Sequence, residues 1–229
     1  MSASALKLIS SMATREVLAE LASQYQRSTA QPVATDAAGG IDVAKRVRAG
    51  EAVDVVILAS DVIDKLIAEG KLLKGRVDVV KSGVAIAVRA GVAKPDISTE
   101  DAVKRAVLAA RSLSYSTGPS GSYLEKMFER WGILEQIRSR IVVPPPGIPV
   151  GSLVAGGSVE LGFQQLSELM RLAGVTVLGP LPPAIQTITT FAGAVSASCG
   201  RPDAARALLD YMGSPVTASI KLQNGMEAA

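Results

Sequence analysis

Four short segments rich in serine, threonine and glycine stand where they could bind a small anion. We predict that each lies just before an amphipathic helix: residues 10–11, 37–40, 117–122 and 146–152. The first N–H groups of a helix lack partners and carry about half a positive charge. Glycine lets a ligand approach the backbone, and hydroxyls add further donors. These segments could therefore bind an anion without any formal charge, although each could equally be an ordinary helix cap.

The residue types that are missing or rare exclude several kinds of chemistry. The chain has no histidine, which rules out Ser-His-Asp catalysis, Cys-His catalysis and zinc bound by histidine. Its one cysteine, Cys199, cannot form an internal disulfide or a thiolate cluster, and we expect it to be a packed small residue. We therefore expect no metal site and no cofactor.

Strand-like and helix-like segments alternate along the whole chain and would position these groups. The apolar runs are continuous rather than alternating, which predicts parallel sheets covered on both faces and an α/β fold class. The predicted strands are 6–9, 32–35, 53–58, 83–88, 112–115, 141–143, 159–163 and 175–178. The predicted helices include 16–26, 121–131, 201–212 and 214–223, and the apolar segments 82–90 and 189–198 could pass between two lobes.

Composition and charge argue against a nucleic-acid-binding protein and against a membrane-embedded one. The chain has 229 residues, 48% of them apolar, so it can bury a sizeable core. Its net charge of +3 and its few aromatic residues do not favour nucleic-acid binding. No run reaches the roughly 18 apolar residues that span a bilayer, so we expect a protein that is not embedded in a membrane. Residues 1–13 do not read as a signal peptide; we expect a periplasmic protein if a signal was removed and a cytoplasmic one otherwise.

The order and spacing of several segments resemble a known family. AVDVVILASD at 52–61, followed by LIAEG at 66–70, resembles molybdate-binding-like members of the type 2 periplasmic solute-binding proteins. The resemblance continues in LLDYM at 208–212, in Ser214–Pro215, in Gly225, and in the strand-then-helix segments at 6–22 and 112–131. It covers nearly the whole chain and rests on order and spacing more than on any single motif.

This resemblance implies two Rossmann-like lobes joined by two crossing strands, with a ligand cleft between them. It places one lobe at 1–81 plus 196–229 and the other at 82–195. It also implies a monomer that delivers its ligand to an ABC transporter permease. Carried over by position and joined by the donors of the four segments, the implied ligand-binding residues are Ser10, Ser11, Ala13, Gly39, Gly40, Ser120, Gly121, Ser122, Val150, Ser152 and Gln165.

Three of these positions depart from the family pattern. Ala13 and Gly40 fall at or near positions where a molybdate site has serines, and Gln165 falls near its tyrosine. The resemblance therefore favours an organic acid over molybdate or tungstate. Gln164 could add an amide to the site, and Arg15 could neutralise a carboxylate.

The segment GFQQLSE at 162–168, with GPLP at 179–182, resembles the branch of this family that includes aconitate isomerase. An isomerase would move a proton on an unsaturated di- or tricarboxylate and would need a general base. Without histidine, the candidates are Asp36, Asp42, Glu168 and Tyr123, each of which could equally be a surface or capping group. The sequence thus leaves open a binding protein and an isomerase. A sensor module is a third class, but the chain has no helix-turn-helix segment.

Overall fold

The computed structural model of this chain describes residues 4–145 and 147–229, so Pro146 of the fourth segment lies outside the described residues. The chain divides into two compact units. Unit 1 comprises Met1–Ser82 and Thr189–Ala229, and unit 2 comprises 83–188. The chain leaves unit 1 within strand β4 (Val77–Arg89) and returns at the start of strand β8 (Ile188–Val195).

Unit 1 contains a mixed sheet in the order β2-β1-β3-β8-β4. β1 pairs in parallel with β2 and β3, whereas β3 and β8 are antiparallel, as are β4 and β9. Besides β4 and β8, the elements of this unit are β1 (Leu6–Ser11), η1 (Met12–Thr14), α1 (Arg15–Thr29), β2 (Val33–Ala38), α2 (Gly40–Arg48), β3 (Val55–Ala59), α3 (Ser60–Ala68), α9 (Pro202–Gly213), η4 (Pro215–Thr217), α10 (Ala218–Gln223) and β9 (Glu227–Ala228).

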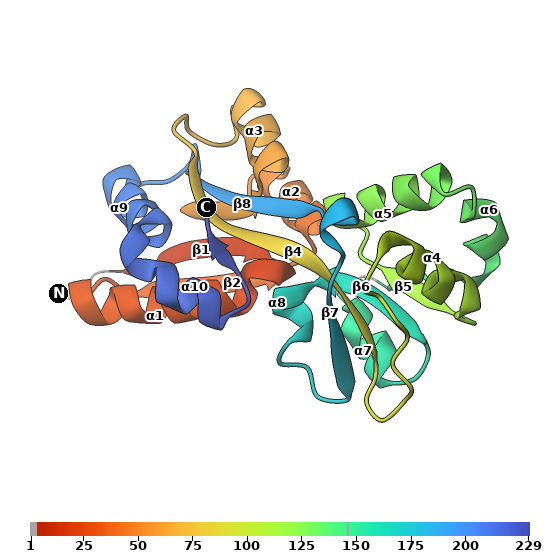
Figure 1. The fold of residues 1–229 in the computed structure, drawn as a ribbon. Coiled ribbons are helices and arrows are strands. Elements are labelled where there is room, and N and C mark those ends of the chain that lie inside the picture. Colours follow the sequence, from red (N-terminus) through yellow and green to blue (C-terminus); the bar gives the residue numbers. More distant parts are fainter. Residues whose placement is uncertain (1–3, 146) are drawn as a thin grey trace. The chain divides into compact units, whose positions relative to one another are not determined.

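Helices cover both faces of this sheet, as Figure 1 shows. One apolar cluster joins α1 and α9 to the strands through residues such as Leu18, Leu21 and Leu208. A second cluster joins α2 and α3 to the strands through residues such as Val43 and Ile63. Because β3 is buried on both faces, its sequence is a continuous apolar run.

Unit 2 is built around the second part of β4, which pairs antiparallel with β6 and β7, while β5 and β6 are parallel. Its further elements are α4 (Glu100–Ala109), β5 (Leu113–Tyr115), α5 (Pro119–Arg130), α6 (Leu134–Ile137), η2 (Arg138–Arg140), α7 (Val150–Ala155), β6 (Leu161–Gln165), α8 (Leu166–Leu169), β7 (Val175–Pro180) and η3 (Pro183–Ile185).

Both faces of the unit 2 sheet are likewise covered. The larger cluster packs α4, α5 and α6 on β4 and β6 and includes Phe128 and Phe163, whose rings meet edge-on with centroids 6.1 Å apart. Smaller clusters place α7 and α8 on the opposite face through Val154 and Leu169. The helices that start at the ends of β5 and β6 are therefore firmly packed.

The α/β class predicted from the sequence is confirmed, but two details of that prediction are wrong. The sheets are mixed rather than parallel, since β4 and β8 run antiparallel to their neighbours. A doubly covered strand is apolar throughout whichever way its neighbour runs, so the pattern could not distinguish these cases. Residues 141–143 form only an isolated bridge between Ile141 and Leu113 instead of a strand. In the described residues, no helix is both long and apolar enough to cross a bilayer.

Candidate functional site

In unit 1, the first segment lies at the carboxyl end of β1 rather than in a loop. Ser10 and Ser11 are the last two residues of the strand, and their side chains are buried. The Ser10 hydroxyl donates to the Ser11 carbonyl oxygen at 3.3 Å, and the Thr14 hydroxyl donates to the same oxygen at 3.1 Å. The Ser11 hydroxyl itself is buried and has no hydrogen-bond partner among the described residues. A buried hydroxyl is normally hydrogen-bonded, so this one is a candidate ligand donor.

The second segment lies beside the first. Gly39 is the N-cap of α2, and Ser11 is the register partner of Ala38 in the parallel β1–β2 pair. A Cβ on Gly40 would lie 3.9 Å from the Ser11 Cβ. The start of α2 is therefore next to the Ser11 hydroxyl, at the edge where β1 and β2 end. Ala13 lies in the short η1 turn that follows Ser11.

An open pocket of about 290 Å³ in unit 1 is lined by Ser10, Arg15, Ala19, Thr35, Asp36 and Ala37. Its charged side chains already have partners. Arg15 is exposed and forms an ion pair with Glu16 at 2.9 Å. Asp36 accepts from Arg46 at 2.8 Å and from the Ala37 N–H at 2.8 Å. The pocket therefore combines two hydroxyl side chains, Ser10 and Thr35, with charges that are locally balanced.

The contact with Arg46 also sets the acidity of Asp36. The hydrogen bond from the guanidinium lowers the pKa of this carboxyl below its usual value. Arg46 also binds Glu51 through two nitrogens, each at 2.6 Å, and lowers the pKa of Glu51 in the same way. Asp36 is therefore a stabilised anion and a weak base.

In unit 2, the third segment forms the first turn of α5, which begins at Pro119. Proline has no N–H to leave unpaired at this position. Ser120 and Gly121 are buried, and the Ser120 and Ser116 hydroxyls lie 2.9 Å apart. The Ser122 N–H bonds to the Gly118 carbonyl at 3.1 Å, so the Ser120 and Gly121 N–H groups precede that first helical bond.

The fourth segment starts the six-residue helix α7, where Val150 is buried. The Gly151 N–H donates to Oε1 of Gln164 at 2.8 Å, and the Ser152 N–H donates to the Pro149 carbonyl at 3.0 Å. The Ser152 side chain is exposed. At this helix start, between the predicted ligand-binding residues Val150 and Ser152, the Gly151 N–H is already bonded to a side chain of the same unit.

The end of β6 carries the two glutamines. Gln164 and Gln165 are the last residues of the strand, and both are buried. Because Tyr115 and Phe163 are register partners in the parallel β5–β6 pair, the residues that follow both strands lie at one edge of the sheet. Unit 2 thus brings the third segment and the glutamines to the same edge.

Glu168 follows the glutamines in the first turn of α8 and is partly buried. Its Oε1 accepts from Nε2 of Gln164 at 2.7 Å. Burial raises the pKa of Glu168 to about 7, although the bond from Gln164 acts in the opposite direction. This carboxyl can therefore accept and release a proton near neutral pH.

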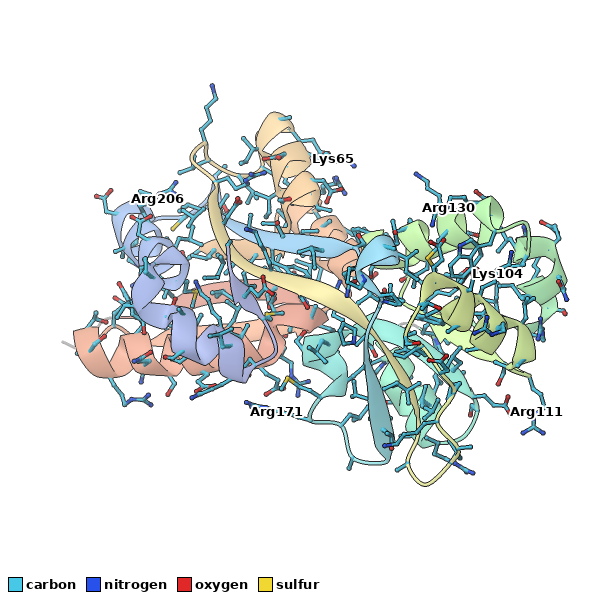
Figure 2. The ribbon with its side chains drawn as sticks, in the orientation of Figure 1. Lys65, Lys104, Arg111, Arg130, Arg171 and Arg206 are labelled. Atoms are coloured by element: carbon cyan, nitrogen blue, oxygen red, sulfur yellow. The ribbon has the colours of Figure 1, made fainter. Side chains whose placement is uncertain are left out.

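The remaining candidates are engaged elsewhere. The Tyr123 hydroxyl donates to the Ile185 carbonyl at 3.1 Å. Basic side chains labelled in Figure 2 also have local partners: Lys104 donates to the Trp131 carbonyl at 3.0 Å, and Arg130 pairs with Glu100 at 2.9 Å. The candidate donors at the strand ends are therefore mainly hydroxyl, amide and N–H groups. No cluster of three or more acidic or cysteine side chains suited to a metal occurs in residues 4–145 and 147–229.

Sequence reasoning missed Ser116. Its hydroxyl contacts Ser120, and its backbone packs on Gly121. The signal was present, because Ser116 follows the apolar run of β5, and ligands tend to bind beyond the carboxyl ends of strands. The third segment was taken to begin at residue 117, just before the expected helix, so it left out Ser116 at the end of the strand.

The fold is that of the solute-binding proteins, and comparison with known proteins identifies the family. Residues 6–227 match the family described as bacterial extracellular solute-binding protein, and the chain belongs to it. The chain is also 36% identical to an aconitate isomerase from a Pseudomonas species over 231 residues, which cover 97% of this chain and 87% of that protein.

Solved structures agree on the fold. The periplasmic molybdate-binding protein of Azotobacter vinelandii superposes with a TM-score of 0.80 at 22% identity, covering 96% of this chain and 98% of that one. The sulfate-binding protein SubI from Mycobacterium tuberculosis gives 0.78 at 18% identity, covering 97% and 86%. The resemblance inferred from the order of segments is thereby confirmed.

Proposed function

We propose that this protein is a solute-binding protein that captures a small organic acid. The observation that carries the proposal is the buried Ser11 hydroxyl, which has no partner in the described part of the chain and lies beside the start of α2. A hydroxyl in that position can donate to a carboxylate oxygen, and the dipole of α2 favours the negative charge. In unit 2, the N–H groups of Ser120 and Gly121 at the start of α5 are the equivalent donors.

The chemistry of the donors supports a carboxylate over a tetrahedral oxyanion. Ala13 and Gly40 offer no hydroxyl where the family's molybdate site has serines, and Gln165 offers an amide in place of a phenol. An amide both donates and accepts, which suits a partly protonated or hydroxylated acid. The proposed ligand-binding residues remain those predicted from the sequence, with Ser116 added as a residue that positions Ser120.

The family supports a location outside the cytoplasm and delivery of the acid to an ABC transporter permease, and we include both in the proposal. In this scheme the protein acts as a monomer and changes conformation on binding.

Thermal unfolding with molybdate, tungstate, sulfate, phosphate, citrate, cis-aconitate and trans-aconitate tests this function. A ligand present at 100 times its Kd stabilises the folded protein by about 2.7 kcal/mol. That raises the unfolding midpoint by about 5–10 °C for a chain of this size. We expect a shift with one or more of the carboxylates. A shift with molybdate or tungstate alone would contradict the preference for an organic acid.

A second function is proton transfer on an unsaturated di- or tricarboxylate. The specific observation in its favour is Glu168, whose pKa of about 7 suits a general base, and the 36% identity to an aconitate isomerase supports it. Incubation with cis-aconitate in deuterated water separates the two functions. Binding alone leaves the acid unchanged and unlabelled, whereas an isomerase forms trans-aconitate and labels it when the protonated base exchanges with the solvent before returning its proton.

A further inference from the structure

The structure distinguishes sharply among the groups that could remove a proton from a bound acid. Asp36 is bound by Arg46, and Asp42 is exposed, 3.9 Å from Lys45. The Tyr123 hydroxyl is committed to the Ile185 carbonyl. Glu168 is partly buried, and its one hydrogen bond from a side chain in the described residues comes from the neutral amide of Gln164. A carboxylate without a cation to stabilise its charge is the strongest base among these groups.

Two hydrogen bonds tie Glu168 to the start of α7. The Gly151 N–H donates to Oε1 of Gln164 at 2.8 Å, which orients the amide so that its Nε2 donates to Glu168 at 2.7 Å. Gln164 is buried, so it has little freedom to turn. A Cβ on Gly151 would lie 2.6 Å from Cδ2 of Leu172, so a larger residue would displace that leucine side chain. The chain Gly151–Gln164–Glu168 therefore fixes one carboxylate oxygen.

The charged residues nearest to Glu168 lie beyond the segments that pack on α8: β4 contacts α8 through Ala85 and Ala87 and carries Arg89 at its end, and Arg171 follows α8. α8 contacts β6 and β7, and α7 also packs on β6 and β7. The sequences of these neighbours are LGFQQ for β6, VTVLGP for β7 and VGSLVA for α7, and none contains an acidic or basic side chain. The raised proton affinity of Glu168 therefore comes from burial among neutral groups.

We propose that Glu168 is the residue that carries the proton when this protein isomerises an unsaturated polycarboxylate, and that Gln164 is the positioning residue that holds it. This inference rests on the second function proposed above. Glu168 lies three residues after Gln165, a proposed ligand-binding residue, at the edge where β5 and β6 end. The acid it serves has a CH₂ group beside a C=C bond, with carboxylates on the three-carbon unit.

The step balances without any co-reactant. The ionised Glu168 removes a proton from the CH₂ carbon, and that C–H electron pair forms a new C=C bond as the original one opens. The displaced pair is delocalised onto the carboxylate of the ligand. Glu168, now protonated, returns its proton to the carbon at the other end of the three-carbon unit. The double bond has moved, nothing is oxidised or reduced, and the carboxylate is regenerated.

The test compares wild type with Glu168→Gln and with the control Glu129→Gln, which changes an exposed glutamate on α5. Each protein is assayed for conversion of cis-aconitate, for deuterium uptake and for binding by calorimetry. Gln keeps an oxygen to accept from Gln164 but cannot take up a proton. We expect Glu168→Gln to bind the acid while conversion and exchange fall by at least about 100-fold, and Glu129→Gln to match wild type.

Each other outcome overturns the inference in a distinguishable way. If Glu168→Gln converts the acid at the wild-type rate, Glu168 is not the residue that carries the proton, but the proposed isomerase function is unaffected. Wild type that binds the acid without conversion or exchange would exclude the isomerase function together with Glu168. Loss of binding in a folded Glu168→Gln would make Glu168 a ligand contact instead.

The pH dependence of kcat/KM distinguishes a proton-carrying role for Glu168 from a purely structural one. It can be measured on wild type even if Glu168→Gln does not fold. In wild type, kcat/KM should fall as the pH drops through about 7, because protonated Glu168 cannot accept a proton. Gln164→Leu removes the hydrogen bond that lowers the pKa of Glu168, so this limb should move to higher pH. An unchanged limb in Gln164→Leu would contradict the role given to Gln164, and a wild-type profile flat from pH 6 to 8 would contradict Glu168.

Discussion

The backbone of Gly121 lies directly against the Ser116 carbonyl: a Cβ on Gly121 would be 1.6 Å from that oxygen. This contact brings the end of β5 close to the first turn of α5. No side chain can be accommodated there without moving the backbone. Glycine at this position is therefore required by the packing of the candidate site.

Gly121→Ala should destabilise the protein by about 3 kcal/mol, since the clash is with backbone. This corresponds to a fall in the unfolding midpoint of about 6–12 °C, measured by calorimetry. Any folded variant should bind the ligand more weakly because the first turn of α5 is displaced. Gly118→Ala is the matched control, since a Cβ there meets nothing within 4 Å, and it should stay close to wild type.

Ser11→Ala should weaken ligand binding without lowering the free energy of unfolding of the free protein. Its hydroxyl has no partner among the described residues, so its removal sacrifices no internal hydrogen bond. A hydrogen bond to a charged ligand contributes about 1.5–3 kcal/mol, so Kd should rise by about 10- to 150-fold in calorimetry. Ser114→Ala gives the opposite pattern, because the Ser114 hydroxyl donates to the Val142 carbonyl at 2.7 Å. That variant should lose stability and keep its affinity.

Glu168 should make stability fall as pH rises through the neutral range. Its pKa is raised from 4.5 to about 7 in the folded protein, so the unfolded chain releases this proton first. The loss begins above pH 4.5, is complete above about pH 7 and amounts to about 3 kcal/mol. Denaturation of wild type and Glu168→Gln at several pH values measures it. The free energy of unfolding of Glu168→Gln should rise relative to that of wild type between pH 4.5 and 8. A difference that stays constant with pH would contradict the prediction.

Lys221 should also reduce stability at neutral pH. Its side chain is fully buried and its Nζ has no hydrogen-bond partner in the described chain, so burial lowers its pKa below 10.5. The penalty is present at low pH and disappears as pH rises toward 10.5, where the unfolded chain also loses the charge. Lys221→Met should therefore be more stable than wild type at pH 7, by about 1–3 kcal/mol. The gain should shrink toward pH 10, while the exposed Lys126→Met should show no such trend.

Gly40→Ser should move selectivity toward tetrahedral oxyanions. A Cβ at Gly40 meets only Leu58 and Ser11 side-chain atoms, at 3.9 Å, so the substitution fits without strain. The added hydroxyl would stand at the start of α2, where the resemblance places a serine of the molybdate site. We expect the Kd ratio of tungstate to citrate to fall by about 10-fold. Gly39→Ser, where a Cβ would lie 3.2 Å from Asp42, is the comparison, and an unchanged ratio in Gly40→Ser would contradict this interpretation.

Much of the architecture could be predicted from the residues alone. Continuous apolar runs such as VVILA at 55–59 predicted doubly covered strands, because only a strand buried on both faces lacks polar alternation. The helix predicted at 121–131 corresponds to α5, whose buried residues Leu124, Met127 and Phe128 recur at helical spacing. The order of these segments was sufficient to indicate the solute-binding family, and the absence of histidine removed whole classes of catalysis.

Tertiary structure decided what each polar group does. Gly151 and Gln164 are 13 residues apart, and only the packing of α7 on β6 shows that they bond. Asp36 and Glu168 were equivalent candidates in the sequence, yet an arginine holds one as a stable anion and burial raises the pKa of the other. The direction of each strand likewise depends on pairing with strands that are distant along the chain.

The sequence by itself determined which elements form and which chemistry is excluded, because these depend on residue type and local spacing. Proton affinity and hydrogen-bond partners depend on distances between remote residues, and only the fold sets those distances.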